Sequence, residues 1–248
     1  MKEIIYKTIQ LKELHKYFEL AYEEGFVTLK HSRGRNTIKI RSPFVLDEDT
    51  AKLAGMMLDG SLIKDLRRIY FPQFKDLSKI YLFRDLLIKK FSPNNRIFMA
   101  KGKSDYRTYI NSTTLANFFY HVLKIPKSDE QMNVPKWIFH SPDSVKYAYL
   151  REAFAMEGTI LKKLHEIRFI TKDNLFAISI KKLLKAVDID SHITERIGGT
   201  PPTLQYRVSI YRKENFERFC NIGFSLPFHQ ERFRQLLIKY HINQNCSL

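Results

Sequence analysis

The sequence repeats itself: residues 51–62 read AKLAGMMLDGSL, and residues 149–160 read YLREAFAMEGTI. In both, an apolar run of helical character ends in a carboxylate and a glycine, Asp59-Gly60 and Glu157-Gly158, before a short strand begins. Either pair alone also suits an ordinary helix C-terminus followed by a turn. The surrounding residues repeat as well, and this favours an internal duplication with one carboxylate in each copy.

The segments that follow the two matching stretches come in the same order. A hairpin is predicted first, and a Lys-Asp pair then leads into an apolar-periodic helix. A second hairpin follows, containing a Tyr-Arg pair, and then another helix. These features are predicted at residues 61–71, 75–76, 80–91, 96–111 and 113–123 in the first copy, and at 159–169, 172–173, 175–187, 192–211 and 214–220 in the second.

Both matching stretches resemble the motif of the LAGLIDADG homing endonuclease family, in its two-repeat, single-chain form. The resemblance implies an α+β fold of pseudo-twofold duplicated αββαββα repeats. Its two antiparallel sheets would form a saddle, with the motif helices packed at the centre. We expect an N-terminal extension over residues 1–46, a first repeat with its linker over 47–140, and a second repeat over 141–248.

The N-terminal extension lies outside the duplication. It is predicted to contain a helix over residues 11–24 and a hairpin over residues 26–41, whose turn at 32–36 is basic and contains glycine. The sequence leaves two interpretations open for this segment. It is either an auxiliary nucleic-acid contact or a packing extension.

The resemblance also implies a divalent cation, Mg²⁺ or Mn²⁺, bound by Asp59 and Glu157 with help from the backbone carbonyls of Leu58 and Met156. Carboxylates at the C-terminal ends of adjacent helices would create a negative site, because the helix dipoles add to the acids. Hard cations prefer oxygen ligands of this kind. Such a cation would activate a water and stabilise both the attacking and the leaving oxygen of a phosphodiester displacement.

Polar residues around the two acids are candidates for positioning that water. By resemblance, Gln73 or Lys75 takes this role in the first repeat, and Lys172 takes it in the second. His229 stands where the family commonly has a lysine before the last helix, and it can exchange a proton near neutral pH. We therefore include all four among the candidate catalytic residues.

Composition favours a nucleic-acid partner. The 248 residues include 42 Lys and Arg against 26 Asp and Glu, a formal net charge of +16. Such a balance attracts polyanions, although a solubilising surface would look the same. We expect double-stranded DNA as the partner, with structured RNA as the alternative. The candidate contacts are Lys64, Arg67, Arg68, Lys101, Lys103, Arg107, Lys162, Lys163, Arg168, Arg196, Arg207 and Arg212.

The motif helices depart from the family at the two positions where it packs them through small residues. These positions hold Ala54 and Leu58 in the first copy, and Glu152 and Met156 in the second. Leucine and methionine would hold the helices farther apart and so separate the acids. The expected activity is a metal-dependent, site-specific endodeoxyribonuclease. The alternative is a domesticated, non-cleaving DNA- or RNA-binding protein, such as a transcription regulator or splicing cofactor.

Several other classes of protein are disfavoured. No run approaches the ~18 apolar residues of a membrane span, and the first residues lack a signal-peptide core. Cys220 and Cys246 are the only cysteines, and they indicate neither a disulfide scaffold nor a zinc site. We therefore expect a soluble, cytoplasmic monomer.

Overall fold

The computed structural model describes residues 6–73, 76–102, 105–161, 163, 165–198 and 201–242. The chain divides into two compact units. The first comprises Met1–Glu130 and His140–Pro142, and the second comprises Gln131–Phe139 and Asp143–Leu248. The first unit includes the N-terminal extension together with the first repeat.

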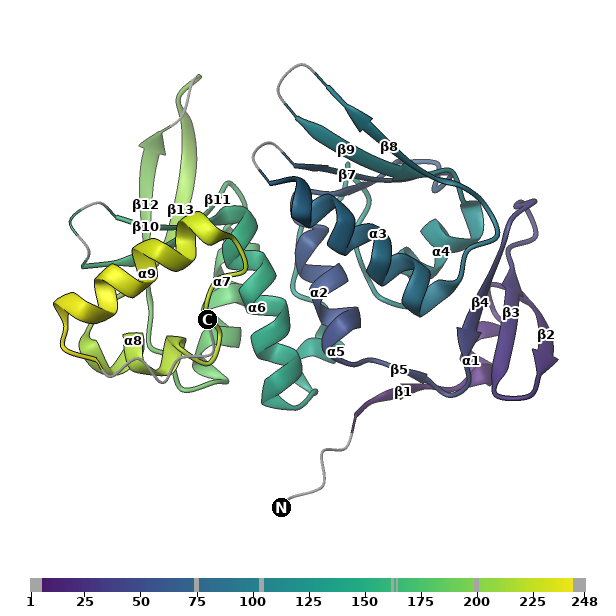
Figure 1. Ribbon diagram of the computed structural model, residues 1–248, viewed down its shortest axis with the longest axis horizontal. Helices are drawn as coiled ribbons and strands as arrows, with labels where there is room; N and C mark the ends of the chain where they lie inside the picture. Colours follow the sequence, from purple (N-terminus) through teal and green to yellow (C-terminus); the bar gives the residue numbers. More distant parts are fainter. Residues whose placement is uncertain are drawn as a thin grey trace. The chain divides into compact units, whose positions relative to one another are not determined.

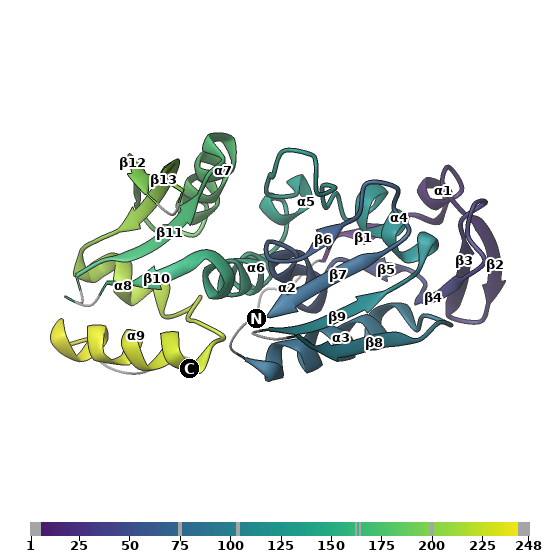
Figure 2. The same cartoon turned by 90° about the horizontal axis from the view of Figure 1, so that it is seen from above.

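The first repeat alternates helices with pairs of strands. Its sheet is antiparallel with the order β6-β7-β9-β8, which Figure 2 shows from above. Its elements are α2 (Glu48–Met56), β6 (Ser61–Leu62), β7 (Ile69–Gln73), α3 (Leu77–Phe91), β8 (Ile97–Lys101), β9 (Tyr106–Ile110) and α4 (Thr113–His121).

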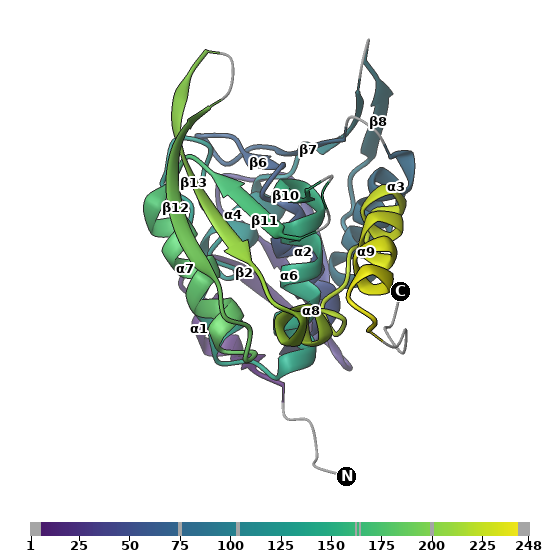
Figure 3. The ribbon, with the colours of Figure 1, turned by 90° about the vertical axis from the view of Figure 1, so that its left-hand side faces the viewer.

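The second repeat contains the same αββαββα order, with α5 before it and α9 after it, and has the equivalent strand order, β10-β11-β13-β12 (Figure 3). Its elements are α5 (Lys136–Phe139), α6 (Asp143–Glu157), β10 (Gly158–Ile160), β11 (Ile167–Thr171), α7 (Asn174–Lys185), β12 (His192–Gly198), β13 (Thr203–Ile210), α8 (Lys213–Phe219) and α9 (Pro227–Lys239). The predicted α+β fold with duplicated αββαββα repeats is confirmed.

Aspartates begin the helices in both repeats. The side chain of Asp47 accepts a hydrogen bond from the backbone N–H of Thr50 at the start of α2. Asp76 and Asp173 cap α3 and α7 in the same way, at the second residue of each repeated Lys-Asp pair. A carboxylate at this position satisfies a backbone N–H that the helix leaves unpaired. The repeated pair is therefore a repeated helix start.

Each sheet buries one face against its own helices. In the first repeat Phe71 of β7 stacks on Phe83 of α3, with ring centroids 4.6 Å apart. In the second, Phe169 of β11 packs against Phe154 of α6 and Phe176 of α7, at 5.4 and 5.7 Å. These rings are buried, so each repeat has its own aromatic core, and Figure 1 shows α3 below β7 and β9.

The N-terminal extension contains β1 (Thr8–Ile9), α1 (Leu11–Leu14), β2 (Glu19–Glu23), β3 (Phe26–Lys30), β4 (Thr37–Arg41) and β5 (Phe44–Val45). The predicted hairpin is confirmed as β3 and β4. The predicted helix over residues 11–24 is wrong, because it ends at Leu14 and Glu19–Glu23 instead pairs along the whole of β3. Pairing with a preformed hairpin outweighs the weak local preference for helix in this segment.

Cys220 is disulfide-bonded, which the sequence did not indicate. A pair of distant cysteines lacks the repeated spacing from which a disulfide framework is read, and Cys246 lies outside the described residues. Among the helices of the described ranges, none is both long enough and apolar enough to cross a membrane.

Candidate nucleic-acid interface and acidic site

Asp59 lies in the turn between α2 and β6. The backbone N–H groups of Leu58 and Asp59 donate to the carbonyls of Gly55 and Met56, both at 3.2 Å, so the last helical turn tightens before the strand. Burial raises the pKa of the Asp59 carboxyl to about 6. No hydrogen bond or ion pair from a described residue offsets this burial. Among the described residues, none compensates the charge of the Asp59 carboxylate.

Glu157 is the last residue of α6, and Gly158 begins β10 without an intervening turn. A β-carbon on Gly158 would lie 2.2 Å from the carbonyl oxygen of Phe154, a distance that no side chain tolerates. At Gly60 the corresponding contact is 2.8 Å from the sulfur of Met57, a flexible side chain. At both acid-glycine pairs there is too little space for a β-carbon on the glycine. The constraint is stronger at Gly158, because the nearest atoms there belong to the backbone.

The donors around each acid suit a hard cation. Met156 precedes Glu157 in the last turn of α6, and Leu58 precedes Asp59 in the turn that follows α2. Within the described ranges, no group of three or more His, Cys, Asp and Glu residues is placed to hold a metal. Magnesium is commonly held by only one or two carboxylates, with waters and substrate phosphates as its other ligands. A cation beside Asp59 would also favour the charged form that burial disfavours.

The candidate water-positioning residues lie in different surroundings. Gln73 ends β7, opposite Tyr106 of β9, and is buried. Lys172 is exposed at the end of β11, next to the residue that caps α7. His229 lies in the first turn of α9 and is buried, with its ring stacked 5.2 Å from that of Phe224. Lys75 lies outside the described residues.

Three arginines share the face of the second-repeat sheet opposite its core. The strand register places Arg168 of β11 on the same face as Arg207 of β13, and Arg196 of β12 follows two residues after the partner of Arg207. Burial, and then the charges of Arg168 and Arg196, lower the pKa of Arg207. The Nε of Arg207 is buried and has no hydrogen-bond acceptor among the described residues. An anion bound on this face would reduce the repulsion between the arginines and would accept a hydrogen bond from the Nε of Arg207.

Glu166, which the sequence analysis did not single out, holds Arg168 in place. Its two carboxylate oxygens accept hydrogen bonds from Nε and Nη2 of Arg168, both at 2.7 Å. The hydroxyl of Ser209 donates to the same carboxylate. Although burial raises the pKa of Glu166, the hydrogen bonds from Arg168 and Ser209 outweigh it and lower that pKa overall. A buried anion thus orients an arginine of the sheet face.

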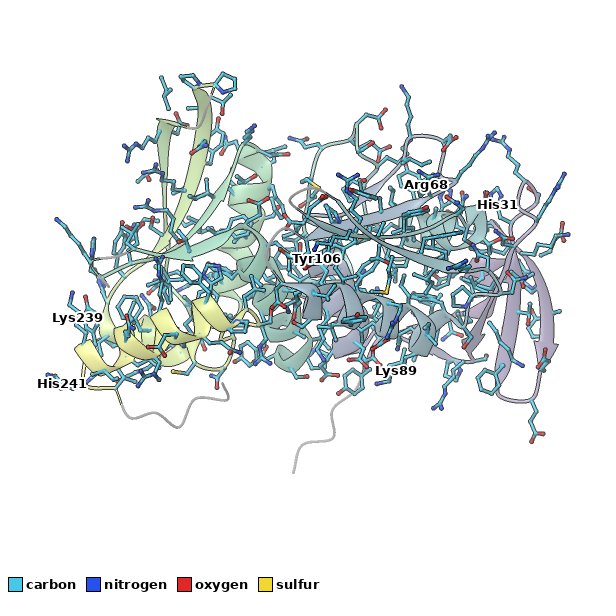
Figure 4. All side chains as sticks on the ribbon, turned by 45° about the horizontal axis from the view of Figure 1, so that its top comes forward. His31, Arg68, Lys89, Tyr106, Lys239 and His241 are labelled. Atoms are coloured by element: carbon cyan, nitrogen blue, oxygen red, sulfur yellow. The ribbon has the colours of Figure 1, made fainter. Side chains whose placement is uncertain are left out.

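The corresponding face of the first-repeat sheet is aromatic. The Tyr109 ring stacks on Phe98 with centroids 4.9 Å apart and an interplanar angle of 9°. The guanidinium of Arg68, labelled in Figure 4, lies 5.0 Å from the centre of the Tyr109 ring. That of Arg96 lies 5.2 Å from Phe98. Only Arg68 of these four was predicted, because the contact between the two rings depends on the exact register of the β8–β9 hairpin.

The remaining predicted contacts lie at strand ends and in loops. Arg107 is exposed on β9 and pairs with Asp105 at 2.6 Å. Lys103 and Lys162 lie outside the described residues. The others are exposed, in the β6–β7 loop, at the end of β8, in the β10–β11 loop and at the start of α8: Lys64, Arg67, Lys101, Lys163 and Arg212.

Residues 144–222 match the family model described as the LAGLIDADG-like domain. The match begins within α6, extends past α8, and includes Glu157 and the three arginines of the second sheet. It therefore covers most of the second repeat.

Solved structures share the fold of the chain. The homing endonuclease I-DmoI, in a crystal structure with DNA and Mn, matches with a TM-score of 0.54 and 17% sequence identity, over 71% of this chain and 97% of that one. Full-length DUF199/WhiA from Thermatoga maritima matches with a TM-score of 0.51 and 15% identity, over 81% of this chain and 63% of that one. At these identities the likeness shows the fold alone.

A curated relative is an A-type ATP synthase protein of Pyrococcus abyssi, 28% identical over 195 residues, or 77% of this chain. The chain spans only 18% of the length of that relative. Residues 144–222 thus match a LAGLIDADG-like domain, and the chain shares the fold of the homing endonuclease I-DmoI.

Proposed function

We propose that this protein binds double-stranded DNA and hydrolyses its phosphodiester bonds with Mg²⁺ or Mn²⁺. The observation that carries the proposal is Asp59, a half-buried carboxylate in the turn that follows a motif helix, whose charge no described residue offsets. Glu157 occupies the equivalent position in the second repeat. Both repeats lie in one chain, so the proposal requires only one copy of the protein.

Each candidate residue has a distinct part in this proposal. The carboxylates of Asp59 and Glu157 bind the cation, with the backbone carbonyls of Leu58 and Met156 as further donors. When bound, such a cation lowers the pKa of a water and neutralises charge on the reacting oxygens. Gln73, Lys75, Lys172 and His229 are proposed to orient the attacking water by hydrogen bonding.

The two sheet faces are proposed to hold the DNA. Arg168, Arg196 and Arg207 offer guanidinium groups that suit phosphate oxygens or the acceptor edge of guanine. Contacts to phosphates position a protein on the duplex, whereas contacts to base edges carry sequence information. The exposed lysines and arginines of the loops and strand ends would add phosphate contacts.

The second candidate function is a domesticated protein that binds DNA or structured RNA without cutting it, as a transcription regulator or a splicing cofactor. Glu152 favours it. This residue occupies a position where the family has a small side chain, and in the structure it is buried and accepts a hydrogen bond from Ser225 at 3.0 Å. Leu58 and Met156 are also larger than the family's usual residues. Both functions predict DNA binding, so only cleavage distinguishes them.

A nicking assay tests the proposal. Plasmid and genomic DNA are incubated with the protein and Mg²⁺ or Mn²⁺, alongside Asp59→Asn, Glu157→Gln and the double variant. Glu24→Gln, an exposed carboxylate in the β2–β3 turn, is the control for loss of one negative charge. We expect metal-dependent cleavage by the wild type and by Glu24→Gln, and its loss in the other variants.

Cleavage that survives in the double variant would exclude the assigned acids. Tight, salt-dependent DNA binding without any cleavage would instead support the non-cleaving function. A gel-shift measurement on the same protein preparations separates these outcomes, because it reads binding alone.

A further inference from the structure

A basic pocket lies within the first unit, between the N-terminal extension and the first repeat. It encloses about 840 Å³. Three segments line it: the β3–β4 turn, the β6–β7 loop, and α4 with the residues just before it. We define the basic pocket by its cationic side chains and its histidines, His31, Arg33, Arg35, Lys64, Arg67 and His121. Asp65 and Tyr120 are the other titratable residues that line it.

The β3–β4 turn is held firmly against the first repeat. The hydroxyl of Thr114 in α4 accepts a hydrogen bond from the backbone N–H of His31 at 3.1 Å and donates to the carbonyl of Asn36 at 2.5 Å. The Asn36 side chain donates to the carbonyl of Asn111 at 2.7 Å. Gly34 packs so closely that a β-carbon there would lie 3.1 Å from the Thr114 hydroxyl. The pocket is therefore preformed rather than assembled from a loose loop.

Positive charge in the basic pocket is poorly neutralised. Within the described part of the chain, Arg33 and Arg35 form no ion pair with a carboxylate, and both are exposed. Among the described residues, Lys64 and Arg67 pair with exposed acids, Asp129 at 3.4 Å and Asp65 at 3.3 Å. Exposed pairs of this kind contribute little and exchange readily for another anion.

Burial and nearby positive charges lower the pKa values of both histidines in the pocket. Burial, and then the charge of Arg33, lower the pKa of His31. Burial, and then Lys124, His31 and Lys127, lower the pKa of His121. Two tyrosine rings pack on His121: that of Tyr17, stacked at 4.2 Å, and that of Tyr120, edge-on at 4.8 Å. Each histidine therefore faces cations and would take up a proton more readily once an anion is bound.

The basic pocket adjoins the aromatic face of the first sheet. Arg67 lines the pocket, while its neighbour Arg68 stacks on Tyr109 of that face. The Nε of Arg68 also donates to the side-chain oxygen of Asn111, a pocket residue, at 2.6 Å. A strand lying on the sheet face could thus place its next phosphates in the pocket, and Figure 4 labels His31 and Arg68 on these two parts.

We propose that the basic pocket binds a backbone phosphate of the nucleic acid and so extends the binding surface from the first sheet onto the N-terminal extension. The inference rests on the proposed nucleic-acid binding, but it assigns a separate phosphate site to residues of the N-terminal extension together with residues of the first repeat. It decides between the two interpretations of the extension in favour of an auxiliary contact.

The salt dependence of DNA binding tests the phosphate contact. Affinity for a random-sequence duplex is measured by fluorescence anisotropy over a series of salt concentrations, for the wild type and for Arg33→Ala/Arg35→Ala. Losing the contact should reduce the slope of log K against log salt by about 1–2 units. Lys12→Ala/Lys16→Ala, which removes two exposed charges of the same extension outside the pocket, should leave the slope unchanged. Equal slopes for all three proteins would overturn the inference while leaving DNA binding intact.

A second measurement separates this inference from the proposed function. The pKa values of His31 and His121 are followed by NMR with and without inorganic pyrophosphate, and then with the duplex. We expect both pKa values to rise on addition of either probe, and the rise to be lost in Arg33→Ala/Arg35→Ala. A response to pyrophosphate without any duplex binding would keep the phosphate site and reject the DNA-binding function. No response to either probe would reject the site.

Discussion

Gly158 lies so close to Phe154 that a β-carbon on the glycine would sit 2.2 Å from the phenylalanine carbonyl oxygen. The neighbouring contacts, at 2.9 Å, are also to backbone atoms of Phe154. Since backbone cannot move aside as a flexible side chain can, Glu157 is followed by glycine for a steric reason that has nothing to do with catalysis.

Gly158→Ala should therefore destabilise the second repeat. Forcing a methyl group against backbone costs about 1–3 kcal/mol of unfolding free energy. Gly198→Ala is the matched control, because there a β-carbon would meet only the end of the Gln205 side chain, at 2.9 Å. Chemical denaturation of both variants checks the prediction, and equal losses would contradict it.

Asp59→Asn should stabilise the protein at neutral pH in the absence of metal. The pKa of Asp59 is raised from 3.8 to about 6, so the folded protein binds more protons than the unfolded chain between these values. Stability from this group is present at low pH and is lost as pH rises through about 6. We expect a gain of about 1–2 kcal/mol near pH 7.5, after allowance for partial exposure.

The gain from Asp59→Asn should disappear as the pH falls well below 3.8, where the wild-type carboxyl is protonated in both states. Thermal melts across this range in a chelator measure it, with Glu24→Gln as the exposed control. A pH-independent difference would show that the substitution acts through packing rather than through charge.

Glu166→Gln should show the opposite dependence on pH. The folded-state pKa of Glu166 is lowered, so its stabilisation is present above the ordinary value of 4.5 and is lost as pH falls through the lower folded value. Near pH 7 we expect a loss of about 1–3 kcal/mol, because the buried charge-assisted bonds to Arg168 are weakened. Denaturation at pH 7 and in acid would test this, and an undiminished loss in acid would be evidence against it.

Arg107→Ala/Arg207→Ala should weaken DNA binding, since the two residues lie on the faces proposed to hold the duplex. Each lost phosphate contact reduces the salt slope by about 1 unit. Arg234→Ala is the control for charge, because Arg234 is exposed on α9 and pairs with Glu231 at 2.9 Å. Unchanged affinity of the double variant would remove the sheets from the interface.

Tyr109→Leu should destabilise the first repeat by about 1–2 kcal/mol, because it removes the ring between Phe98 and Arg68. Tyr109→Phe retains the ring and should lose much less. Differential scanning calorimetry compares the two variants. Equal melting temperatures for both would assign the effect to something other than stacking.

The repeated elements could be predicted because their signals are local. Apolar periodicity located α3 and α7, and the aspartates that cap them recur within each Lys-Asp pair. The strand Glu19–Glu23 was missed because its partner, not its composition, makes it a strand. Glu166 was missed for a similar reason, since its role depends on Arg168 and on Ser209, which strand pairing brings next to it.

The sequence identifies Asp59 and Glu157 as candidate acids, but it does not predict the pKa of the Asp59 carboxyl. A resemblance of motif identifies Asp59, whereas its raised pKa depends on burial that only the folded chain defines. The basic pocket likewise joins residue 31 to residue 121, a separation that no sequence pattern spans.

The unlike faces of the two sheets have a consequence for any target that the protein recognises. A homodimer must present identical surfaces to both half-sites, which suits palindromes. Here the sheet of one copy has stacked rings flanked by Arg68 and Arg96, and the sheet of the other has Arg207 beside the charges of Arg168 and Arg196. Because both copies lie in one chain, their sheet faces can differ. A cognate sequence would therefore be non-palindromic, since one half would be contacted by aromatic rings and the other mainly by guanidinium groups.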